Sequence, residues 1–525
     1  MTSTLDGARE TSPGADAGFF KATGRDPSGA PLIVLDGAHL TASEVAAVAR
    51  GGETVALAPE ARSRNAAARA AIAEHLAHGG RLYGASTGVG ALRDREIDDQ
   101  HREEFQWNLL RSHAVTVGNP LSREIVRAGM VVRANQLGAG GAGVAPELFD
   151  ALIAALNEGL VPVTRELGSL GTGDLPALCE IALALLGEGQ VWREGKPAAA
   201  PARARPIRLG MRDGVGFISS NAVTTGHAAL LSVDLELLHE AWLTVAALSF
   251  EALDADPLVL DERVQAARGS PGQAAVAAKM RELLAGAQLD PRAPNRLVQD
   301  PYPFRVLPQV DGVAHDALRA LAEVVSRELN ARPENALIDD RAVLPTGNFY
   351  AGELAAVLDA VRGAMAQSAS LIAARVSALL DPRMSGLPPF LSADPGPESG
   401  VMMLEYTAHA AASEMRTLAL SMATQTAWAS LGVESHASFA ATAARRTAEL
   451  LRTLRALVAT ELVIAVRALR MVGRSPAAGA TRKLFADASA VLPEGLEDRA
   501  FGRDVMAASA ILEQWSPLGV AFDGH

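Results

Sequence analysis

The chain has 525 residues, 49% of them hydrophobic and 21% charged, which is the composition of a globular protein with a large core. A formal net charge of −12 gives it no attraction for nucleic acid or for an anionic membrane, so neither is expected as a partner. The single cysteine, Cys179, excludes an internal disulfide framework and a cysteine-based zinc site. The 11 histidines show neither an H-E-x-x-H pattern nor clustered ligand spacing, so we expect no metal.

The ends and the apolar runs of the sequence indicate a cytoplasmic protein. Residues 1–30 lack the apolar core of a signal peptide and are rich in Pro, Gly, Ser and Asp. They are predicted to form a flexible tail, because they cannot bury enough apolar surface to offset the cost of ordering. No apolar run is expected to cross a bilayer, since charged side chains interrupt the most apolar stretch, Ala228 to Leu253.

The segment from Leu40 to Gly80 is predicted to be helical. Thr41-Ala-Ser-Glu44 has the form of a capping box, in which the threonine and glutamate side chains satisfy each other's backbone amides. An alanine-rich helix then runs to Ala77 and ends at a glycine pair. Further along, Lys196 to Arg205 is predicted to be a surface connection. Short strands are expected at Pro206–Leu209 and Val215–Ile218.

Two glycine-rich loops match motifs of other enzyme classes. Gly84-Ala-Ser86-Thr-Gly88 has the form of a hydrolase nucleophile elbow, and Gly138-x-Gly140-x-x-Gly143 has the form of a dinucleotide fingerprint. Both chemistries require a strand before the loop and alternating strands and helices around it. The segments that precede these loops are predicted to be helical, so we interpret the loops as turns between helices.

Beyond residue 226 the sequence becomes strongly helical. Apolar residues recur at intervals of three or four over segments of twenty or more residues, as on one face of a helix. The clearest series are Leu354, Val357, Leu358, Val361 and Met365, and Leu451, Leu454, Val458, Leu462, Val466 and Leu469. We therefore predict an all-α fold with a smaller, loop-rich N-terminal region at 31–225 and a bundle of long helices at 226–525. Apolar faces of this length also favour packing between subunits.

Several separate motifs follow one another in a single order along the chain. They are Tyr83-Gly-Ala-Ser-Thr87-Gly-Val-Gly90, Gln106-Trp-Asn108-Leu-Leu-Arg-Ser112-His113, Gly168-Ser-Leu-Gly171-Thr172-Gly173-Asp174, Gln299-Asp-Pro-Tyr302-Pro-Phe-Arg305, Gly347-Asn-Phe349, Ser413-Glu414 and Val433-Glu434-Ser-His436. Each alone is a weak signal, but together they span residues 32–475. In this order they resemble the aromatic amino acid ammonia-lyases, and the histidine ammonia-lyase branch most.

The resemblance implies a bundle of long, nearly parallel helices in a homotetramer whose active sites are shared among subunits. In this family an Ala-Ser-Gly triplet cyclises into methylidene-imidazolone (MIO), an electrophile that captures the amine of a small amino acid substrate. The matching triplet here is Gly171-Thr172-Gly173. Dehydration of threonine would leave an ethylidene arm in place of a methylidene, so the expected cofactor is an ethylidene variant of this group.

The resemblance also implies a role for individual residues. Tyr83 would act as acid or base at the substrate's β-carbon, with a pKa depressed by cationic neighbours. Arg305 would hold the substrate carboxylate as a bidentate pair. Glu414 would contact the substrate amine or side chain. The supporting residues would be Tyr302 and Gln299 for the cofactor loop and proton traffic, Phe349 for the cofactor pocket, and Ser219 or Asn221 in the place of the family's asparagine.

His113 bears on the choice of substrate. The pair Ser112-His113 matches histidine ammonia-lyases, and an imidazole at this position could hydrogen-bond an imidazole or a phenol. The alternative is that His113 only caps or packs its helix.

Three functions are consistent with the sequence. The first is elimination of ammonia from an aromatic amino acid, histidine first, to give the α,β-unsaturated acid. The second is an aminomutase on the same scaffold, which returns the ammonia to the β-carbon. The third is a scaffold without the cofactor, with different chemistry or a binding role, which the departures at Gly171, Thr172 and Ser219 favour.

Overall fold

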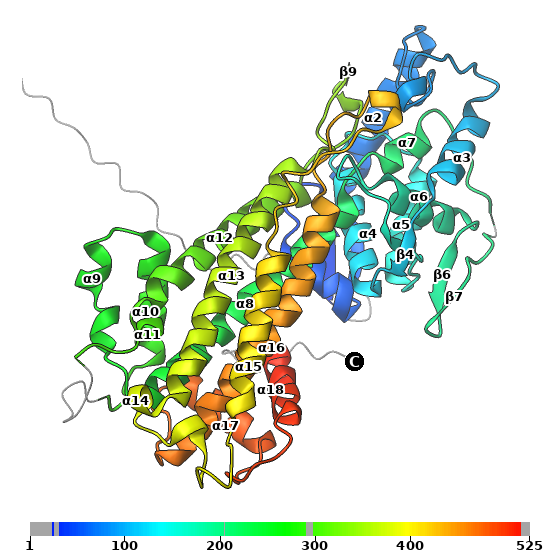
Figure 1. Ribbon diagram of the computed structural model, residues 1–525. Helices are drawn as coiled ribbons and strands as arrows, with labels where there is room; N and C mark the ends of the chain where they lie inside the picture. Colours follow the sequence, from blue (N-terminus) through cyan, green and yellow to red (C-terminus); the bar gives the residue numbers. More distant parts are fainter. Residues whose placement is uncertain (1–23, 26–30, 204, 290–297, 516–525) are drawn as a thin grey trace, which may run out of the picture.

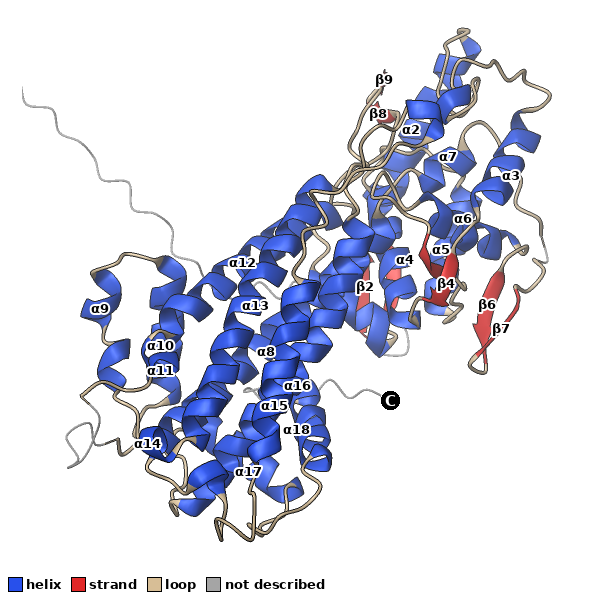
Figure 2. Ribbon diagram, in the orientation of Figure 1, coloured by secondary structure: helices blue, strands red, loops and turns tan. Residues whose placement is uncertain are grey.

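The computed structural model describes residues 24–25, 31–203, 205–289 and 298–515. The predicted tail, residues 1–30, lies outside the described residues except for the strand β1 (Gly24–Arg25). Figure 1 shows an elongated molecule, with a region of short elements at one end and a bundle of long helices at the other. Figure 2 shows that helices dominate both regions and that the strands are short.

The N-terminal region begins with a small sheet. β1 pairs antiparallel with β2 (Pro31–Leu35), and β2 pairs parallel with β3 (Thr54–Leu57). Between them lie α1 (Ala42–Ala46) and a π-helical turn, and α2 (Pro59–Ala77) follows β3. The capping box at Thr41 and the end of α2 at Ala77 are confirmed. The prediction of helix throughout this segment was wrong at β3, where buried Val55 pairs with Ile33.

Short helices and short strands complete this region. They are α3 (Arg102–His113), β4 (Val117–Pro120), α4 (Arg123–Gly138), α5 (Pro146–Asn157), β5 (Arg165–Leu167), α6 (Leu175–Leu186), β6 (Gln190–Arg193), β7 (Lys196–Ala199) and α7 (Asp213–Ile218). Three predictions here were wrong. Val215–Ile218 is the end of helix α7, the predicted strand at Pro206–Leu209 is irregular chain, and the predicted connection begins with β7, which pairs with β6. A short apolar run fits a buried helix as well as a strand, which explains the first error.

The long-helix bundle is confirmed. Its main members are α8 (Ala222–Leu253), α12 (Leu307–Leu329), α13 (Gly352–Leu380), α15 (Met402–Leu418) and α16 (Ala440–Met471). The apolar faces predicted on α13 and α16 are buried, which supplies most of the stability that long helices need. The remaining elements are α9 (Glu262–Ala266), α10 (Pro271–Leu283), α11 (Tyr302–Arg305), β8 (Leu337–Asp339), β9 (Ala342–Leu344), α14 (Pro382–Ser385), α17 (Gly479–Val491) and α18 (Gly502–Gln514).

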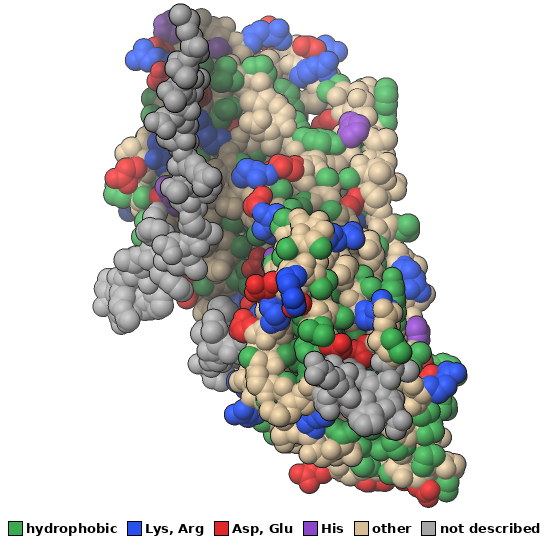
Figure 3. All heavy atoms as spheres, turned by 90° about the vertical axis from the view of Figure 1, so that its left-hand side faces the viewer, with side chains coloured by type: hydrophobic (Ala, Val, Ile, Leu, Met, Phe, Trp, Pro, Cys, Tyr) green, Lys and Arg blue, Asp and Glu red, His purple; other side chains and the backbone are tan. Residues whose placement is uncertain are grey.

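Helix α13 is long and apolar enough to cross a membrane, which corrects the expectation that no segment is. However, 72% of its most apolar window is buried inside the protein, where α13 packs against α12, α15 and α16. Its apolar composition is therefore explained by its place at the centre of the bundle. Figure 3 shows one face of the molecule, on which basic and acidic side chains are interspersed.

Buried charges tie the bundle together at its centre. Arg375 of α13 donates to Glu461 of α16 at 2.8 Å, and Ser249 of α8 donates to the same carboxylate. Trp242 of α8 donates to Asp311 of α12 at 3.0 Å. Burial raises the pKa of Asp311 to about 6, against the opposing effect of Arg375. Four helices are thus held in register by paired polar groups within an apolar core.

Candidate active site

A cavity of about 450 Å³ lies where the N-terminal region meets the loops that precede the bundle helices. Its polar lining residues come from segments far apart in the sequence: Tyr83, His113, Thr172, Ser219, Asn335, Ser430 and Glu434. Its apolar lining includes Leu109, Leu170, Leu175, Pro176, Val215, Ile218 and Phe349. A pocket of this size, with apolar walls and a few converging polar groups, is suited to a small aromatic ligand.

The triplet Gly171-Thr172-Gly173 forms a turn in the wall of this cavity. Gly171 has φ of 82° and Gly173 has φ of 97°, a backbone region that favours glycine. The carbonyl oxygen of Gly171 accepts hydrogen bonds from the hydroxyl of Ser438 at 3.0 Å and from the backbone N–H of Ala351 at 3.3 Å. A Cβ at position 171 would lie 2.1 Å from the Ser438 oxygen, so glycine is required here while Ser438 keeps this position.

These features fit a turn that closes into a ring. Both flanking residues have the conformational freedom that ring closure demands, and the carbonyl that would be attacked is polarised by two donors. Within the described part of the chain, the N–H of Gly173 donates no hydrogen bond and is available as the attacking nitrogen. The residues present therefore fit an imidazolone formed from this triplet.

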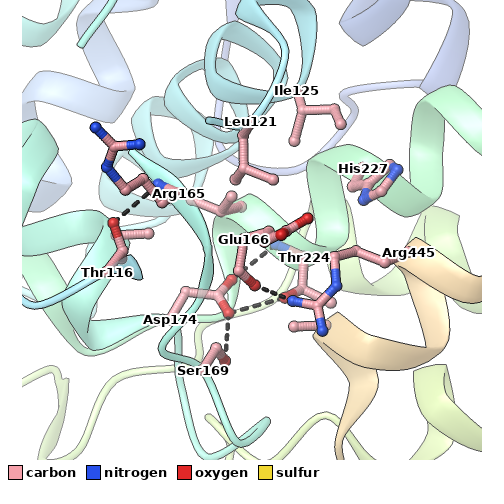
Figure 4. Close-up of a pocket in the computed structure, with 13 residues that line it drawn as sticks. Thr116, Leu121, Ile125, Arg165, Glu166, Ser169, Asp174, Thr224, His227 and Arg445 are labelled. Carbon is pink, nitrogen blue, oxygen red and sulfur yellow. Dashed lines mark hydrogen bonds between the residues drawn. The ribbon is translucent and has the colours of Figure 1, made fainter. Parts of the chain in front are cut away.

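Asp174 directly follows the triplet, and Figure 4 shows its hydrogen bonds to Ser169 and Thr224. Its carboxylate accepts from the Ser169 hydroxyl at 2.8 Å, from the Thr224 N–H at 2.7 Å and from the Thr224 hydroxyl at 2.8 Å. Burial raises the pKa of Asp174, while these donors oppose the shift. Thr224 lies in the first turn of α8, whose positive N-terminal end also favours the carboxylate. The turn is thereby fixed to the start of a 32-residue helix.

Residues 168–177, which include the triplet, form a wall between the larger cavity and a second, small cavity of about 40 Å³. Ser169, Asp174 and Ala177 line the small cavity, together with His227 and Arg445 in Figure 4. Burial lowers the pKa of His227 to about 4, so this imidazole is neutral at physiological pH. Other residues of the wall line the larger cavity, namely Gly168, Leu170, Thr172, Gly173, Leu175 and Pro176.

Tyr83 lines the larger cavity together with Gly90. The hydroxyl oxygen accepts from the Gly90 N–H at 2.9 Å. Burial raises the pKa of Tyr83 and the charge of Glu434 adds to this, whereas Gly90, Arg212 and Arg93 act in the opposite direction. A depressed pKa was expected for this residue, but within a single chain the phenol holds its proton more tightly than usual.

Glu434 approaches the triplet from a loop before α16. Its Oε2 accepts from the Thr172 hydroxyl at 3.5 Å, across 262 positions of sequence. A neighbouring contact ties this loop to the one that carries Phe349, since the Tyr350 hydroxyl lies 2.5 Å from His436 Nδ1. The sequence motif around Glu434 was noted, but its carboxylate was not proposed as a site residue. The motif's place in the collinear series was the signal that could have found it.

The other residues predicted from the N-terminal half are placed as follows. His113 lines the cavity at the end of α3, and its Nδ1 lies 2.9 Å from the Leu109 carbonyl oxygen, so it also caps its helix. Ser219 lines the cavity and its oxygen accepts from the Asn335 N–H at 2.9 Å. Asn221 does not line the cavity. It lies just before α8, and its side chain donates to Glu328 near the end of α12.

A buried charged cluster supports the loop that carries Asn335. Arg133 of α4 donates to Glu334 at 3.0 Å, to the Phe217 carbonyl at 2.8 Å and to the Gly216 carbonyl at 2.5 Å. Arg212 is fully buried near this pair, and burial lowers its pKa to about 10. The cluster joins α4, α7 and the loop at 334–335 beneath the floor of the cavity.

Four predicted residues lie away from the cavity within the single chain. Tyr302 and Arg305 form the short helix α11, which Figure 1 places beside α10, away from α3 and α7. The Tyr302 side chain is 67% exposed, and the Arg305 guanidinium lies 5.8 Å from its ring centre. Gln299 and Glu414 are exposed, Glu414 on α15. In the part of the chain that the structure describes, no group of three or more His, Cys, Asp or Glu is placed to hold a metal.

The fold is a bundle of long helices, and its cavity has the size and lining of a small-molecule site built around a backbone turn. A family model for aromatic amino acid lyases matches residues 40–490 of the chain. The histidine ammonia-lyase of Geobacillus thermodenitrificans (strain NG80-2) is 38% identical over 491 residues, which are 92% of this chain and 97% of that protein. The chain therefore belongs to the aromatic amino acid lyase family, and it is a carbon–nitrogen lyase that resembles histidine ammonia-lyase.

Solved structures have the same fold. The ergothioneine-degrading enzyme ergothionase from Treponema denticola superposes with a TM-score of 0.88 at 27% identity, over 93% of this chain and 100% of that one. The phenylalanine aminomutase of Pantoea agglomerans superposes with a TM-score of 0.87 at 27% identity, over 92% of this chain and 98% of that one. The scaffold is thus shared with enzymes of more than one activity.

Proposed function

We propose that this chain eliminates ammonia from an aromatic amino acid, with histidine as the first candidate, to give the α,β-unsaturated acid. The observation that carries this proposal is the cavity itself. It brings Tyr83 and Glu434 to the triplet turn at Thr172, with His113 on the same lining. A proton acceptor, a proton donor and a reactive turn around one small volume are what an elimination at adjacent carbons needs.

The triplet is proposed to supply the electrophile as an imidazolone with an ethylidene arm. When formed, this group would draw electrons from the substrate amine and make ammonia a better leaving group. Asp174 would keep the turn fixed to α8 while the substrate amine reacts with the electrophile. No metal is part of the proposal.

Glu434 and Tyr83 are proposed to divide the proton transfers between them. The Glu434 carboxylate, which already approaches the Thr172 hydroxyl, would accept the β-proton of the substrate. Tyr83 has a raised pKa and would stay protonated, so it would donate a hydrogen bond or a proton rather than accept one. Residues with opposite pKa requirements in one pocket are typical of acid–base pairs.

The cavity walls favour a flat ring as the substrate side chain. Leu109, Leu170 and Ile218 are apolar, and a ring slotted between them would bury its faces. The Nδ1 atom of His113 is engaged by its own helix, so Nε2 is the nitrogen left to bind an imidazole or a phenol. This supports histidine before phenylalanine as the substrate to test.

A homotetramer would complete the site. Tyr302 and Gln299 are exposed, Arg305 is half-buried, and all three lie away from the cavity of their own chain. Symmetric assembly would place α11 of one copy over the cavity of another, where Arg305 would pair with the substrate carboxylate. The exposed apolar side chains of Tyr406 and Met403 on α15 are consistent with a surface that other copies cover. We propose that this assembly works in the cytoplasm.

Two other functions have specific support. The likeness to a phenylalanine aminomutase favours return of the ammonia to the β-carbon as a variant of the same reaction. The likeness to an ergothioneine-degrading enzyme, together with Gly171 and Thr172 in place of alanine and serine, favours a different substrate amine or an elimination without the imidazolone.

The first test is the mass of the peptide that contains Gly171-Thr172-Gly173, from protein digested without reductant or nucleophile. Loss of two waters, followed by release of ammonia from histidine, is the expected result. Detection of a β-amino acid product would replace the lyase by the aminomutase. An unmodified peptide in well-folded protein would exclude both and leave the third function.

A further inference from the structure

The carbonyl oxygen of Gly171 receives donors from the starts of two long helices. The Ser438 hydroxyl lies just before α16, and the Ala351 N–H lies at the start of α13. Both residues are about as deeply buried as any in the protein, at 1% exposure. The two donors reach the same oxygen at 3.0 and 3.3 Å. Gly171 is buried as well, and hydrogen bonds are electrostatically stronger in such an interior than in water.

Two fixed donors on one carbonyl oxygen are the arrangement of an oxyanion hole. If the nitrogen of Gly173 attacks the carbonyl carbon of Gly171, the electron pair of the carbonyl double bond moves to this oxygen. Buried hydrogen-bond donors stabilise such developing charge without having to reorganise. The positive ends of the helices behind the donors add to the effect.

We propose that Ser438 and the Ala351 N–H form an oxyanion hole that drives ring closure of the triplet. The inference rests on the proposed function, since it concerns how the chain makes its own electrophile. Ser438 is then a catalytic residue of maturation, because its hydroxyl touches an atom that reacts. It has no role in the later turnover of substrate.

The step balances within the chain. A bond forms between Gly173 N and Gly171 C, and the proton of the nitrogen goes to the Gly171 oxygen. That oxygen leaves as the first water with the proton of the Thr172 backbone nitrogen, which gives the double bond between this nitrogen and the Gly171 carbon. The Thr172 hydroxyl and the proton on its Cα leave as the second water, which gives the carbon–carbon double bond. No oxidant or other reactant is consumed.

Ser438 also explains why glycine stands at position 171. Its hydroxyl occupies the space into which an alanine Cβ would project, with 2.1 Å between the two atoms. The backbone nitrogens of Phe439 and Ala440 would also lie within 3.0 Å of that Cβ, so this end of the loop before α16 leaves room only for glycine. Ser438 has a structural contact as well, since its oxygen accepts from the Ala440 N–H at 3.4 Å. A test must separate this contact from the proposed chemistry.

The experiment compares Ser438→Ala with wild type and with Ser392→Ala. Ser392 is a matched control, since it is also 1% exposed and donates to a backbone carbonyl, that of Glu398, at 3.2 Å. The mass of the triplet peptide is followed with time after rapid purification, and circular dichroism and thermal unfolding verify the fold. We expect the wild type and Ser392→Ala to lose two waters, and Ser438→Ala to lose them about 100-fold more slowly or not at all.

The outcomes distinguish this inference from the proposed function. If the wild-type peptide loses two waters and folded Ser438→Ala loses them at the same rate, the oxyanion hole is overturned and the lyase stands. If the folded wild type loses none, both fall together. Should Ser438→Ala not fold, Ala351→Pro removes the other donor at a residue whose φ of −84° lies near the range of proline. Unchanged ring closure in folded Ala351→Pro would equally overturn the proposal.

Discussion

The cavity around Thr172 and the surface of α11 differ in burial, in hydrogen bonding and in charge. The cavity is enclosed by loops and helix starts, and its polar groups are held by hydrogen bonds from segments far apart in the sequence. Helix α11 has four residues, and Tyr302 on it is 67% exposed. The cavity lacks a cation for a carboxylate among its lining residues, and α11 offers one in Arg305 without a pocket. This difference is what the proposed homotetramer would require, in which the cavity of one copy and α11 of another together make one site.

The largest effect is expected from Thr172→Ala. Without the hydroxyl, the carbon–carbon double bond of the electrophile cannot form, so activity should fall by at least about 1000-fold while the fold is kept. The triplet peptide should then lose at most one water. Thr172→Ser is the control, because it keeps the hydroxyl and should keep activity. Equal activity of Thr172→Ala and wild type would show that the enclosed half-site works without the electrophile.

Complementation tests whether the halves come from different chains. Tyr83→Phe and Arg305→Ala should each lower activity by about 100-fold or more, because one removes a proton donor and the other the carboxylate partner. When the two variants are refolded or co-expressed together, about one quarter of the sites combine an intact Tyr83 with an intact Arg305. Activity should recover to about that fraction of wild type. No recovery in mixed oligomers would mean that each chain builds its site alone.

The importance of Glu434 and Glu414 for catalysis can be compared through single substitutions. Glu434→Gln should lower kcat by about 100-fold with little change in KM, because the carboxylate that would accept the β-proton becomes a neutral amide. Glu414→Gln should have a smaller effect, since Glu414 is exposed on α15 and does not line the cavity of its chain. The reverse order in steady-state kinetics would restore Glu414 as the functional carboxylate.

Two buried ion pairs allow the effects on stability and on activity to be separated. Arg133–Glu334 lies near the cavity, and Arg375–Glu461 lies in the helix bundle. Arg133→Met and Arg375→Met should each lower the free energy of unfolding by about 3–5 kcal/mol, because each leaves a buried glutamate without its partner. Only Arg133→Met should also lower activity beyond what its folded fraction explains, since its partner Glu334 precedes Asn335 in the cavity lining. Chemical denaturation and activity per folded protein measure the two effects. A similar loss of activity in Arg375→Met would contradict the separation.

The smallest effect is a pH dependence within the bundle. The pKa of Asp311 is raised to about 6 by burial, so the folded state binds a proton more tightly than the unfolded state does. The contribution of Asp311 to stability is therefore fully present below about pH 4 and is lost as pH rises towards 6, by no more than about 3 kcal/mol. Asp311→Asn should remove this part of the pH profile of unfolding. An unchanged profile would assign the dependence to other groups.

The sequence predicted the helices with a regular apolar period and the loops that are rich in glycine. The faces of α13 and α16 follow a helical period, and both are buried as expected. Tyr83, Thr172 and Phe349 lie on loops marked by glycine, and all three line the cavity. The helical faces are local features that a single stretch of residues contains, whereas the three cavity residues were predicted from the resemblance that several motifs carry together.

The parts that escaped prediction depend on contacts over long distances. The role of Glu434 arises only when its loop meets Thr172, and a motif does not specify that contact. The strand β3 exists because β2 lies beside it. The Arg375–Glu461 pair joins two helices whose relative rotation sets the match. The raised pKa of Tyr83 likewise follows from burial that no local pattern reveals.

The wall formed by residues 168–177 has a consequence for how the substrate range of this enzyme could evolve. Leu170, Leu175 and Pro176 face the larger cavity, whereas Ser169, Asp174 and Ala177 face the small one behind it. Mutations on the first face would alter substrate range, and mutations on the second would alter the support of the turn. Because one short segment keeps these tasks on opposite sides, selection can explore new substrates without dismantling the apparatus that makes the enzyme reactive.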